Sequence, residues 1–223
     1  MDKGVGKVPN YVWGVDSASN VTAELLDCVT TNFGRPVFWG RYLTRVEGAS
    51  EGLSPQEINF LRDKGIKIMP IYNVFTSATG YQKGKEAAYN AVHHANNLGF
   101  PKGTAIFANV ERFFEVDHHW IKGWVDALYT SGYKTGIYHD PVTGGFNQAY
   151  CQAARESNRV KVQTILWSAE PETGATKATN APAFNPQKPD CEGNVWLWQY
   201  GRDVKECPID TNLADERVLQ MMW

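Results

Sequence analysis

Carboxylate side chains end several apolar, strand-like stretches of this chain. The stretch 103–111 is apolar and finishes in Glu111. A strand alternates its side chains between two faces, so Glu111 shares one face with Phe107 and Asn109. Asp16 and Asp210 stand in comparable β-rich stretches near the two ends of the chain. If these strands are parallel and close into a barrel, the three carboxylates meet at one rim.

Three carboxylates in one cleft indicate acid–base chemistry on a polar bond. Crowded carboxylates cannot all ionise freely, so at least one pKa rises. Glu111 with a raised pKa would donate a proton to a leaving oxygen. Asp16 or Asp210 would stay ionised and activate water or stabilise an oxocarbenium-like charge. The alternative is structural: Asp16 and Asp210 cap loops, and Glu111 pairs with Arg41.

Other strand ends carry side chains suited to holding a polar ligand. These candidate substrate-binding residues are Arg41, Tyr72, Asn109, Tyr138, Trp167 and Gln199. Aromatic faces pack well against the apolar faces of sugar rings. They pack equally well in ordinary cores, which is the commoner place for any single Trp.

The elements that must position these residues alternate between strands and helices. Strands are predicted at 11–16, 36–42, 66–72, 103–111, 134–139, 162–168, 194–200 and 209–212, and helices at 21–33, 55–65, 81–98, 117–131, 146–157 and 213–221. Asn20 is the expected cap of the first helix, and Ser54 with Glu57 forms a capping box for the second. Pro70 cannot donate to a ladder, so a bulge or strand end is expected there.

Strand–helix alternation predicts parallel strands with helical crossovers. The expected fold is α/β: a single TIM-barrel-like (β/α) barrel over residues 11–223, with irregular or missing helices in the C-terminal half. Residues 1–10 are expected to be a disordered or extended N-terminus. The long loop at 169–194 is typical of a functional or disordered segment.

The composition excludes some classes of partner. The 22 basic and 24 acidic residues give a net charge of −2, which provides no electrostatic reason to bind nucleic acid or an anionic membrane. No apolar run approaches the roughly 20 residues of a membrane span. Residues 1–9 lack the apolar region of a signal peptide, and a secreted or cell-wall-associated location stays open. A monomer is expected.

No cofactor or metal is expected. The chain has no GxGxxG or GxxxxGK[ST] motif, which argues against the usual nucleotide-binding folds. The adjacent pairs His93–His94 and His118–His119 cannot share a helix face. Cys28, Cys151, Cys191 and Cys207 form no CxxC pair, which argues against zinc. Free thiols packed as small hydrophobes are expected, with a Cys191–Cys207 disulfide across one predicted strand as the alternative.

A series of short motifs occurs in a fixed order along nearly the whole chain. They are Gly14-Val15-Asp16, Gly40-Arg41-Tyr42, Pro70-Ile71-Tyr72, Ile106-Phe107-Ala108-Asn109-Val110-Glu111, Gly136-Ile137-Tyr138, Leu197-Trp198-Gln199-Tyr200 and Ile209-Asp210-Thr211-Asn212. Together they resemble the glycoside-hydrolase-like domains of the DUF1906 (Rv2525c-like) group, which is related to the family 25 lysozymes. The resemblance implies a TIM-barrel-like fold and a carbohydrate cleft.

The resemblance also implies roles for individual residues. The lysozyme relatives carry Asp-x-Glu on the fourth strand, with the Glu as catalytic acid, and this maps onto Asn109-Val110-Glu111. Glu111 is retained, and Asp16 and Asp210 match the other acidic positions. Asn109 replaces an aspartate, and a neutral amide cannot act as a base or stabilise a cation as strongly.

Two functions of different classes follow. The first is a glycosidase acting on a bacterial cell-wall glycan, with Glu111 as the acid and Asp16 and Asp210 as supporting carboxylates. The second is a catalytically inactive barrel that binds peptidoglycan or another carbohydrate, which Asn109 favours. Hydrolysis of an amide or ester would need a nucleophile or metal that the sequence does not display.

Overall fold

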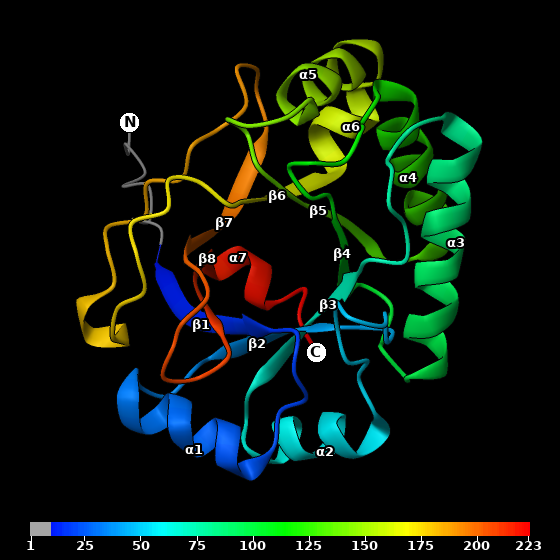
Figure 1. Ribbon diagram of the computed structural model, residues 1–223. Coiled ribbons are helices and arrows are strands. Elements are labelled where there is room, and N and C mark those ends of the chain that lie inside the picture. The colour runs from blue at the N-terminus through cyan, green and yellow to red at the C-terminus, as the bar shows by residue number, and fades with distance from the viewer. Residues whose placement is uncertain (1–9) are drawn as a thin grey trace, which may run out of the picture.

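Within residues 10–223, which the computed structural model describes, eight strands close into a barrel with helices outside it (Figure 1). The strands are β1 (Tyr11–Ser17), β2 (Phe38–Tyr42), β3 (Lys67–Tyr72), β4 (Ala105–Asn109), β5 (Lys134–His139), β6 (Thr164–Ser168), β7 (Asn194–Gly201) and β8 (Asp210–Asp215). The predicted TIM-barrel-like fold is confirmed. The predicted N-terminal segment 1–10 lies, except for Asn10, outside the described residues.

The helices cover the outside of the barrel unevenly. They are α1 (Ala23–Asn32), α2 (Pro55–Asp63), α3 (Tyr81–Asn97), α4 (His118–Ser131), α5 (Phe146–Glu156), α6 (Asn158–Gln163) and α7 (Glu216–Leu219), with a short 3-10 helix η1 (Ala178–Asn180). The connection from β6 to β7 carries only η1, and a loop joins β7 to β8. The expected irregularity of the C-terminal half is therefore present. The sequence did not predict α6 as a separate helix.

Strand β8 departs from the all-parallel arrangement that the alternation predicted. It pairs antiparallel with both β7 and β1. The connection from β7 to β8 is too short for a helical crossover, so the chain turns back on itself. Its first residue, Asp210, consequently lies at the rim where the parallel strands end, and pairs in register with Asp16.

Alternation along the strands sorts the core into an inner and an outer layer. The inner layer includes Phe38, Met69, Ile71, Ala105, Phe107, Ile165, Trp167, Leu197 and Ala214. Glycine makes room for the larger rings: a Cβ on Gly136 would lie 2.4 Å from the Phe107 ring. The predicted shared face of Phe107 and Asn109 is thus the inner face. The outer layer packs strands against helices and contains Trp39, Tyr72, Trp120 and Trp124.

Two local predictions near the N-terminal half need correction. Helix α1 is capped by Thr22, whose side chain accepts from Leu25 N, and not by Asn20. Pro70 lies inside β3 without a bulge, paired with Arg41 of β2. The β3–β4 ladder begins only at Ile71, so the missing N–H of Pro70 removes no ladder hydrogen bond.

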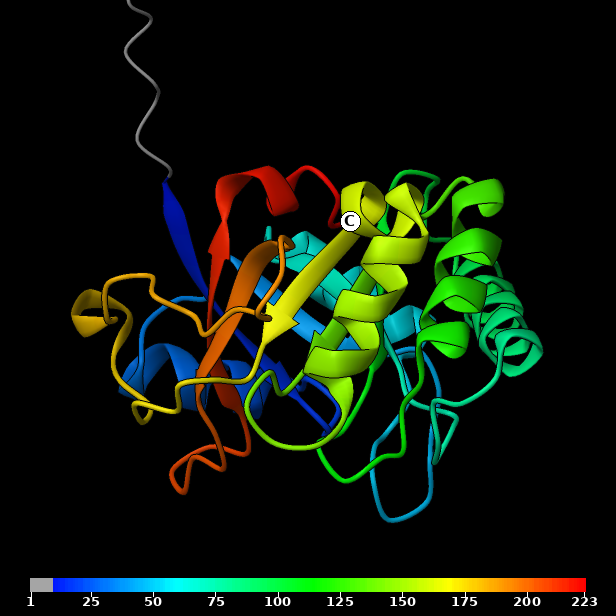
Figure 2. The ribbon, with the colours of Figure 1, turned by 90° about the horizontal axis from the view of Figure 1, so that it is seen from above.

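The C-terminal segment closes one end of the barrel. Val218 and Met222 belong to the inner core, and the backbone of Trp223 exchanges two hydrogen bonds with Ile68. Figure 2 shows α7 at this end and the β7–β8 loop at the opposite end. The open end is therefore the one formed by the carboxyl ends of the parallel strands.

Both expectations for the cysteines are wrong. Cys28 is bonded to Cys207, and Cys151 to Cys191. One bond joins α1 to the β7–β8 loop, and the other joins α5 to the segment before β7. Each therefore ties a helix to a connection of the C-terminal half that carries no α-helix.

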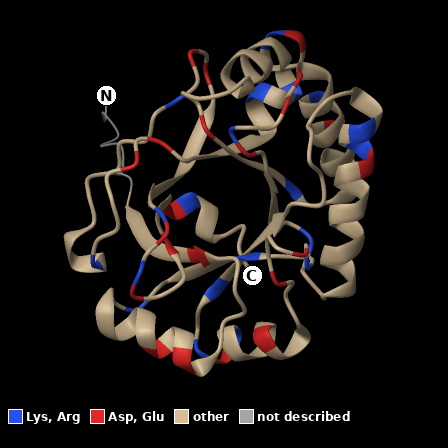
Figure 3. Ribbon diagram, viewed as in Figure 1, with Lys and Arg blue, Asp and Glu red and all other residues tan. Residues whose placement is uncertain are grey.

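Acidic and basic residues are distributed around the outer helices (Figure 3). Among residues 10–223, no helix combines the length and apolar character needed to cross a membrane.

Candidate active site

A cavity of about 220 Å³ opens at the carboxyl ends of the strands. It is lined by Asp16, Tyr42, Asn109, Glu111, Arg112, Phe113, Tyr138, Asp140, Trp167, Ala169, Gln199, Arg202, Asp203 and Asp210. The structure thus brings together all three predicted carboxylates, along with Asn109, Tyr138, Trp167 and Gln199. The seven predicted residues in the cavity come from six different strands or the segments that follow them.

Asp16 and Asp210 form a pair that Gln199 bridges. The Gln199 amide donates to Asp16 Oδ1 at 3.0 Å and to Asp210 Oδ2 at 3.1 Å. Asp16 Oδ1 also accepts from Asn212 Nδ2 at 2.6 Å. Asp210 Oδ1 accepts from the backbone N–H of Asp203 at 2.7 Å. The pair is therefore held by amide donors and not by a cation.

Neighbouring donors fix the orientation of both amides. Tyr138 donates its hydroxyl to Gln199 Oε1 at 2.8 Å, which turns the Gln199 amide nitrogen toward the acids. Trp167 Nε1 donates to Asn212 Oδ1 at 3.0 Å, which turns the Asn212 nitrogen toward Asp16. A flipped Asn212 amide would set its nitrogen against the Trp167 N–H, and a flipped Gln199 amide would set its oxygen against the oxygens of Asp16 and Asp210, so the network favours the observed arrangement.

The acidic pair holds its protons more tightly than free carboxylates do. Burial, and then the charge of Asp210, raise the pKa of Asp16 well above its usual value; the hydrogen bonds from Asn212 and Gln199 oppose this only in part. Burial raises the pKa of Asp210 to about 6, against the hydrogen bond from Asp203. The two acids therefore oppose each other's ionisation, and the pair as a whole binds a proton more readily than two separate exposed carboxylates would.

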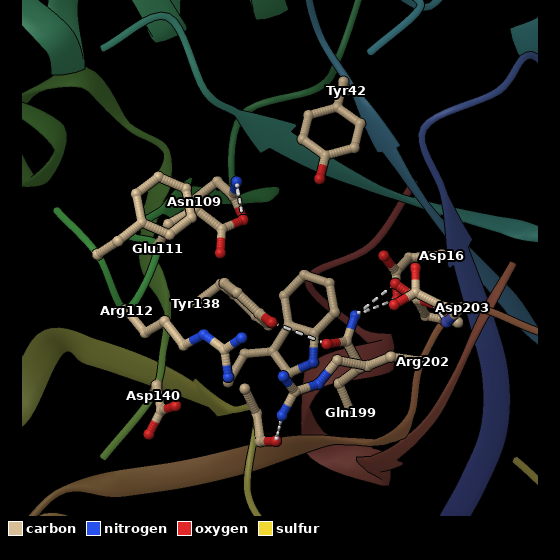
Figure 4. A pocket seen from close by; sticks show the side chains of 14 residues that line it. Asp16, Tyr42, Asn109, Glu111, Arg112, Tyr138, Asp140, Gln199, Arg202 and Asp203 are labelled. Atoms are coloured by element: carbon tan, nitrogen blue, oxygen red, sulfur yellow. Dashed lines mark hydrogen bonds between the residues drawn. The ribbon is translucent and has the colours of Figure 1, made fainter. Parts of the chain in front are cut away.

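Glu111 occupies the other side of the cavity. It follows β4 by two residues, and its Oε1 accepts from Asn109 Nδ2 at 3.0 Å. Figure 4 shows Glu111 across the cavity from Asp16 and Asp203. A substrate group in the space between would have a carboxylate on each side.

Two tyrosines present neutral hydroxyls to the same cavity. Burial, and then the charge of Asp16, raise the pKa of Tyr42. Burial likewise raises the pKa of Tyr138 well above its usual value. Both phenols therefore stay protonated. The Tyr42 hydroxyl points into the cavity (Figure 4), where it can donate to a ligand.

Arg41 and Tyr72, predicted to bind substrate, do not line the cavity. Arg41 is fully buried outside the barrel wall, where its Nε lies 2.6 Å from Glu57 Oε1. It also donates to Ser17 O at 2.7 Å and to Asn20 Oδ1 at 3.0 Å. Tyr72 packs in the outer layer against Trp124, with ring centroids 6.3 Å apart.

The Arg41 pairing overturns two further expectations. Arg41 pairs with Glu57 and not with Glu111, as the structural alternative had supposed. The capping box at α2 is only half formed: Ser54 Oγ accepts from Glu57 N, but the Glu57 carboxylate goes to Arg41 and to Val21 N. A glutamate that can neutralise a buried arginine is held there more strongly than at an exposed cap.

Several lining residues were not predicted as site residues: Tyr42, Arg112, Phe113, Asp140, Arg202 and Asp203. Strand alternation could have found Tyr42, because it shares a face with Phe38 and Gly40 whereas Arg41 does not. Arg112, Arg202 and Asp203 lie beyond strand ends, where alternation gives no information. Asn212 was part of a quoted motif, and its contact with Asp16 depends on the antiparallel direction of β8.

Within residues 10–223, no cluster of three or more His, Cys, Asp or Glu side chains has an arrangement that could hold a metal ion. The carboxylates of Asp16, Glu111 and Asp210 instead accept hydrogen bonds from amides.

Comparisons with known proteins agree with this architecture. The family model of the Rv2525c-like, glycoside hydrolase-like domain matches residues 37–214. The uncharacterised protein YbfG of Bacillus subtilis (strain 168) is 35% identical over 104 residues, which cover 43% of this chain and 14% of YbfG. The chain thus corresponds to a small part of that longer protein.

Two solved structures extend the comparison. A crystal structure of an uncharacterised protein from B. stearothermophilus superposes with a TM-score of 0.94 at 52% identity, covering 95% of this chain and 100% of that one. A muramidase from Acremonium alcalophilum superposes with a TM-score of 0.58 at 16% identity, covering 94% and 97% of the two chains. At that identity the second likeness shows a shared fold.

Proposed function

The chain belongs to the Rv2525c-like, glycoside hydrolase-like family, and on that premise we propose that its barrel hydrolyses a glycosidic bond in a cell-wall glycan. The muramidase that shares the fold supports the choice of glycan. The site supports the choice of bond, because carboxylates on two sides of a cavity are what glycosidic cleavage requires.

The observation that carries the proposal is the placement of Glu111 opposite Asp16 (Figure 4), which Gln199 bridges to Asp210. Glu111 is the acid that protonates the leaving oxygen as the bond from that oxygen to the anomeric carbon breaks. Asp210, whose pKa of about 6 lies below neutral pH, takes the proton of the attacking water or stabilises the positive charge on the sugar. The Gln199 amide and the backbone N–H of Asp203 hold Asp210 in place.

The cavity size indicates how much of the glycan is enclosed. Its volume of about 220 Å³ is below the roughly 300–1,000 Å³ of a pocket for a drug-sized ligand. One sugar of a chain enters it, and the neighbouring sugars lie along the rim. Trp167 forms part of the wall, and Tyr42 and Tyr138 supply hydroxyls.

Asn109 favours a second function, a glycan-binding barrel without catalysis. Asn109 is nine-tenths buried and donates to Glu111. It brings no negative charge to the position where the lysozyme relatives carry an aspartate. A site that binds a sugar by hydrogen bonds alone would tolerate this neutral amide, whereas stabilisation of a cationic transition state is weaker with it.

The test compares Glu111→Gln with the wild type on purified peptidoglycan, measuring the release of reducing ends and the bound fraction. The matched control is Glu115→Gln, which changes an exposed glutamate four residues further along the same loop. Loss of the acid should lower turnover at least about 100-fold, with unchanged thermal unfolding and full activity in the control. Unchanged turnover in Glu111→Gln would reject the assignment. Binding by the wild type without any release would establish the second function.

A further inference from the structure

The residues directly after Glu111 form a tight turn at the edge of the cavity. Phe114 N donates to Glu111 O at 3.0 Å, so Arg112 and Phe113 are the two central residues of a β-turn. Both line the cavity. The turn therefore carries a cation and an aromatic ring at the two positions that follow the proposed catalytic acid.

The neighbouring loop fixes the backbone of this turn. Gly144 has φ of +87°, and a Cβ there would lie 2.3 Å from Arg112 O. Asp140 shapes the approach to Gly144, because its Oδ1 accepts from both Val142 N and Thr143 N at 2.8 Å. Only glycine permits this close approach, so the position of Arg112 is set by the loop after β5.

A chain of rings holds Phe113 at the rim. Phe113 meets Phe114 edge to face, with centroids 5.1 Å apart, and Phe114 meets Phe75 in the same way at 5.8 Å. Phe75 packs on Trp120 in the outer core. Phe113 itself is 76% exposed. An exposed ring with this support offers a fixed apolar face to a sugar.

The two arginines of the cavity differ in what they already bind. Arg202 is engaged: it donates to Glu170 Oε1 at 2.9 Å and to Ala169 O at 2.6 Å. Among residues 10–223 the structure gives Arg112 no hydrogen bond or ion pair, and its guanidinium points into the cavity (Figure 4). Arg112 is therefore the cation that remains available to a ligand.

The other charged side chains of the cavity wall are mostly acidic, and this bears on the kind of ligand that Arg112 would bind. Carboxylates of Asp16, Glu111, Asp140, Asp203 and Asp210 line the cavity. A neutral sugar would find acceptors for its hydroxyl groups there without any cation. A sugar with a negative substituent would be repelled by the same wall unless a cation met that substituent.

We propose that Arg112 binds an anionic substituent, a carboxylate, on the glycan, and that the site thereby selects acidic glycans over neutral ones. The inference rests on the proposed function only in taking a glycan as the ligand. The planar guanidinium suits a carboxylate because it can donate two parallel hydrogen bonds. The carboxylate comes either from an acid substituent on the sugar or from a peptide attached to it.

Binding can be tested with three soluble ligands of equal sugar number: peptidoglycan fragments with their peptides, the same strands without peptides, and a neutral chitooligosaccharide. Dissociation constants are measured by calorimetry for the wild type, Arg112→Gln and Arg112→Lys. The control is Arg155→Gln, an exposed arginine of α5 outside the cavity. Because binding is measured, absence of cleavage would count against the proposed function and leave this result intact.

The wild type should prefer the acidic ligands. Arg112→Gln should weaken them roughly ten- to hundredfold, the usual loss for a hydrogen bond to a charged group, and change the neutral ligand less than about twofold; Arg112→Lys should lie between. If Arg112→Gln loses affinity for both acidic ligands, the carboxylate belongs to the sugar. If it loses affinity only for the peptide-bearing ligand, the carboxylate belongs to the peptide. A wild type without preference, or equal weakening of all three ligands, would overturn the proposal.

Discussion

Replacing Asp210 by Asn should stabilise the protein at neutral pH and destabilise it in acid. Burial raises the pKa of Asp210 from 3.8 to about 6, a shift of about 2 units. At 1.36 kcal/mol per unit this is a cost of about 3 kcal/mol to the folded state once the carboxylate is ionised. Asn at this position never ionises, so the variant does not carry that cost.

The direction of the pH dependence follows from proton binding. The folded pKa lies above the unfolded one, so between pH 4 and 6 the folded chain keeps a proton that the unfolded chain releases. Wild-type stability therefore falls as the pH rises through this window. Asn keeps the acceptor for Asp203 N but turns a donor toward Gln199 Nε2, which costs about 1 kcal/mol at every pH.

The variant should thus be less stable than the wild type by about 0.5 kcal/mol at pH 4 and more stable by about 2 kcal/mol at pH 7. Urea denaturation followed by tryptophan fluorescence at pH 4, 5, 6 and 7, with the disulfides kept oxidised, measures both values. Asp63→Asn, at an exposed position in α2, controls for a lost surface charge. A variant that is less stable at pH 7, or a stability difference that does not change with pH, would refute the reasoning.

Two further predictions concern the parts that hold the site in place. Glu57→Gln leaves the fully buried Arg41 without a counter-charge, so the free energy of unfolding should fall by about 3–5 kcal/mol; a loss below about 1 kcal/mol in urea denaturation would contradict the ion-pair assignment. Cys151→Ser with Cys191→Ser opens a link across 40 residues and should cost about 4 kcal/mol. Non-reducing peptide mapping should first show Cys151–Cys191 and Cys28–Cys207 in the wild type, and a Cys191–Cys207 peptide would contradict the structure.

Strand alternation explains which site residues the sequence could predict. On β4, β5 and β7, the residues predicted at the strand ends (Asn109, Tyr138 and Gln199) share a face with the inner-core or glycine positions of the same strand, and all of them line the cavity. On β2 and β3, Arg41 and Tyr72 have the opposite parity and face outward. Counting two residues forward from Gly40 would have selected Tyr42 instead of Arg41.

Other features depend on contacts that a single sequence does not contain. The direction of β8 follows from a short connection between β7 and β8, and the strand prediction was too short to reveal it. The disulfides join residues 179 and 40 positions apart, so sequence proximity favoured the wrong pair. Glu57 met every requirement of a capping box, but a buried arginine on a neighbouring strand was the stronger partner.

Charged side chains lie on both sides of the barrel wall at the end of β1. Outside the wall, Arg41 donates to the carbonyl of Ser17 and is neutralised by Glu57. Inside it, the preceding residue, Asp16, accepts from Gln199 and Asn212. The position of Asp16 is therefore determined from both faces of the sheet. Glu111 lies at the start of a turn at the rim and accepts one hydrogen bond, from the Asn109 amide. This looser hold suits a group that must exchange its proton with a substrate. The Asp16–Asp210 pair accepts several hydrogen bonds, which suits a group that must hold a charge in place.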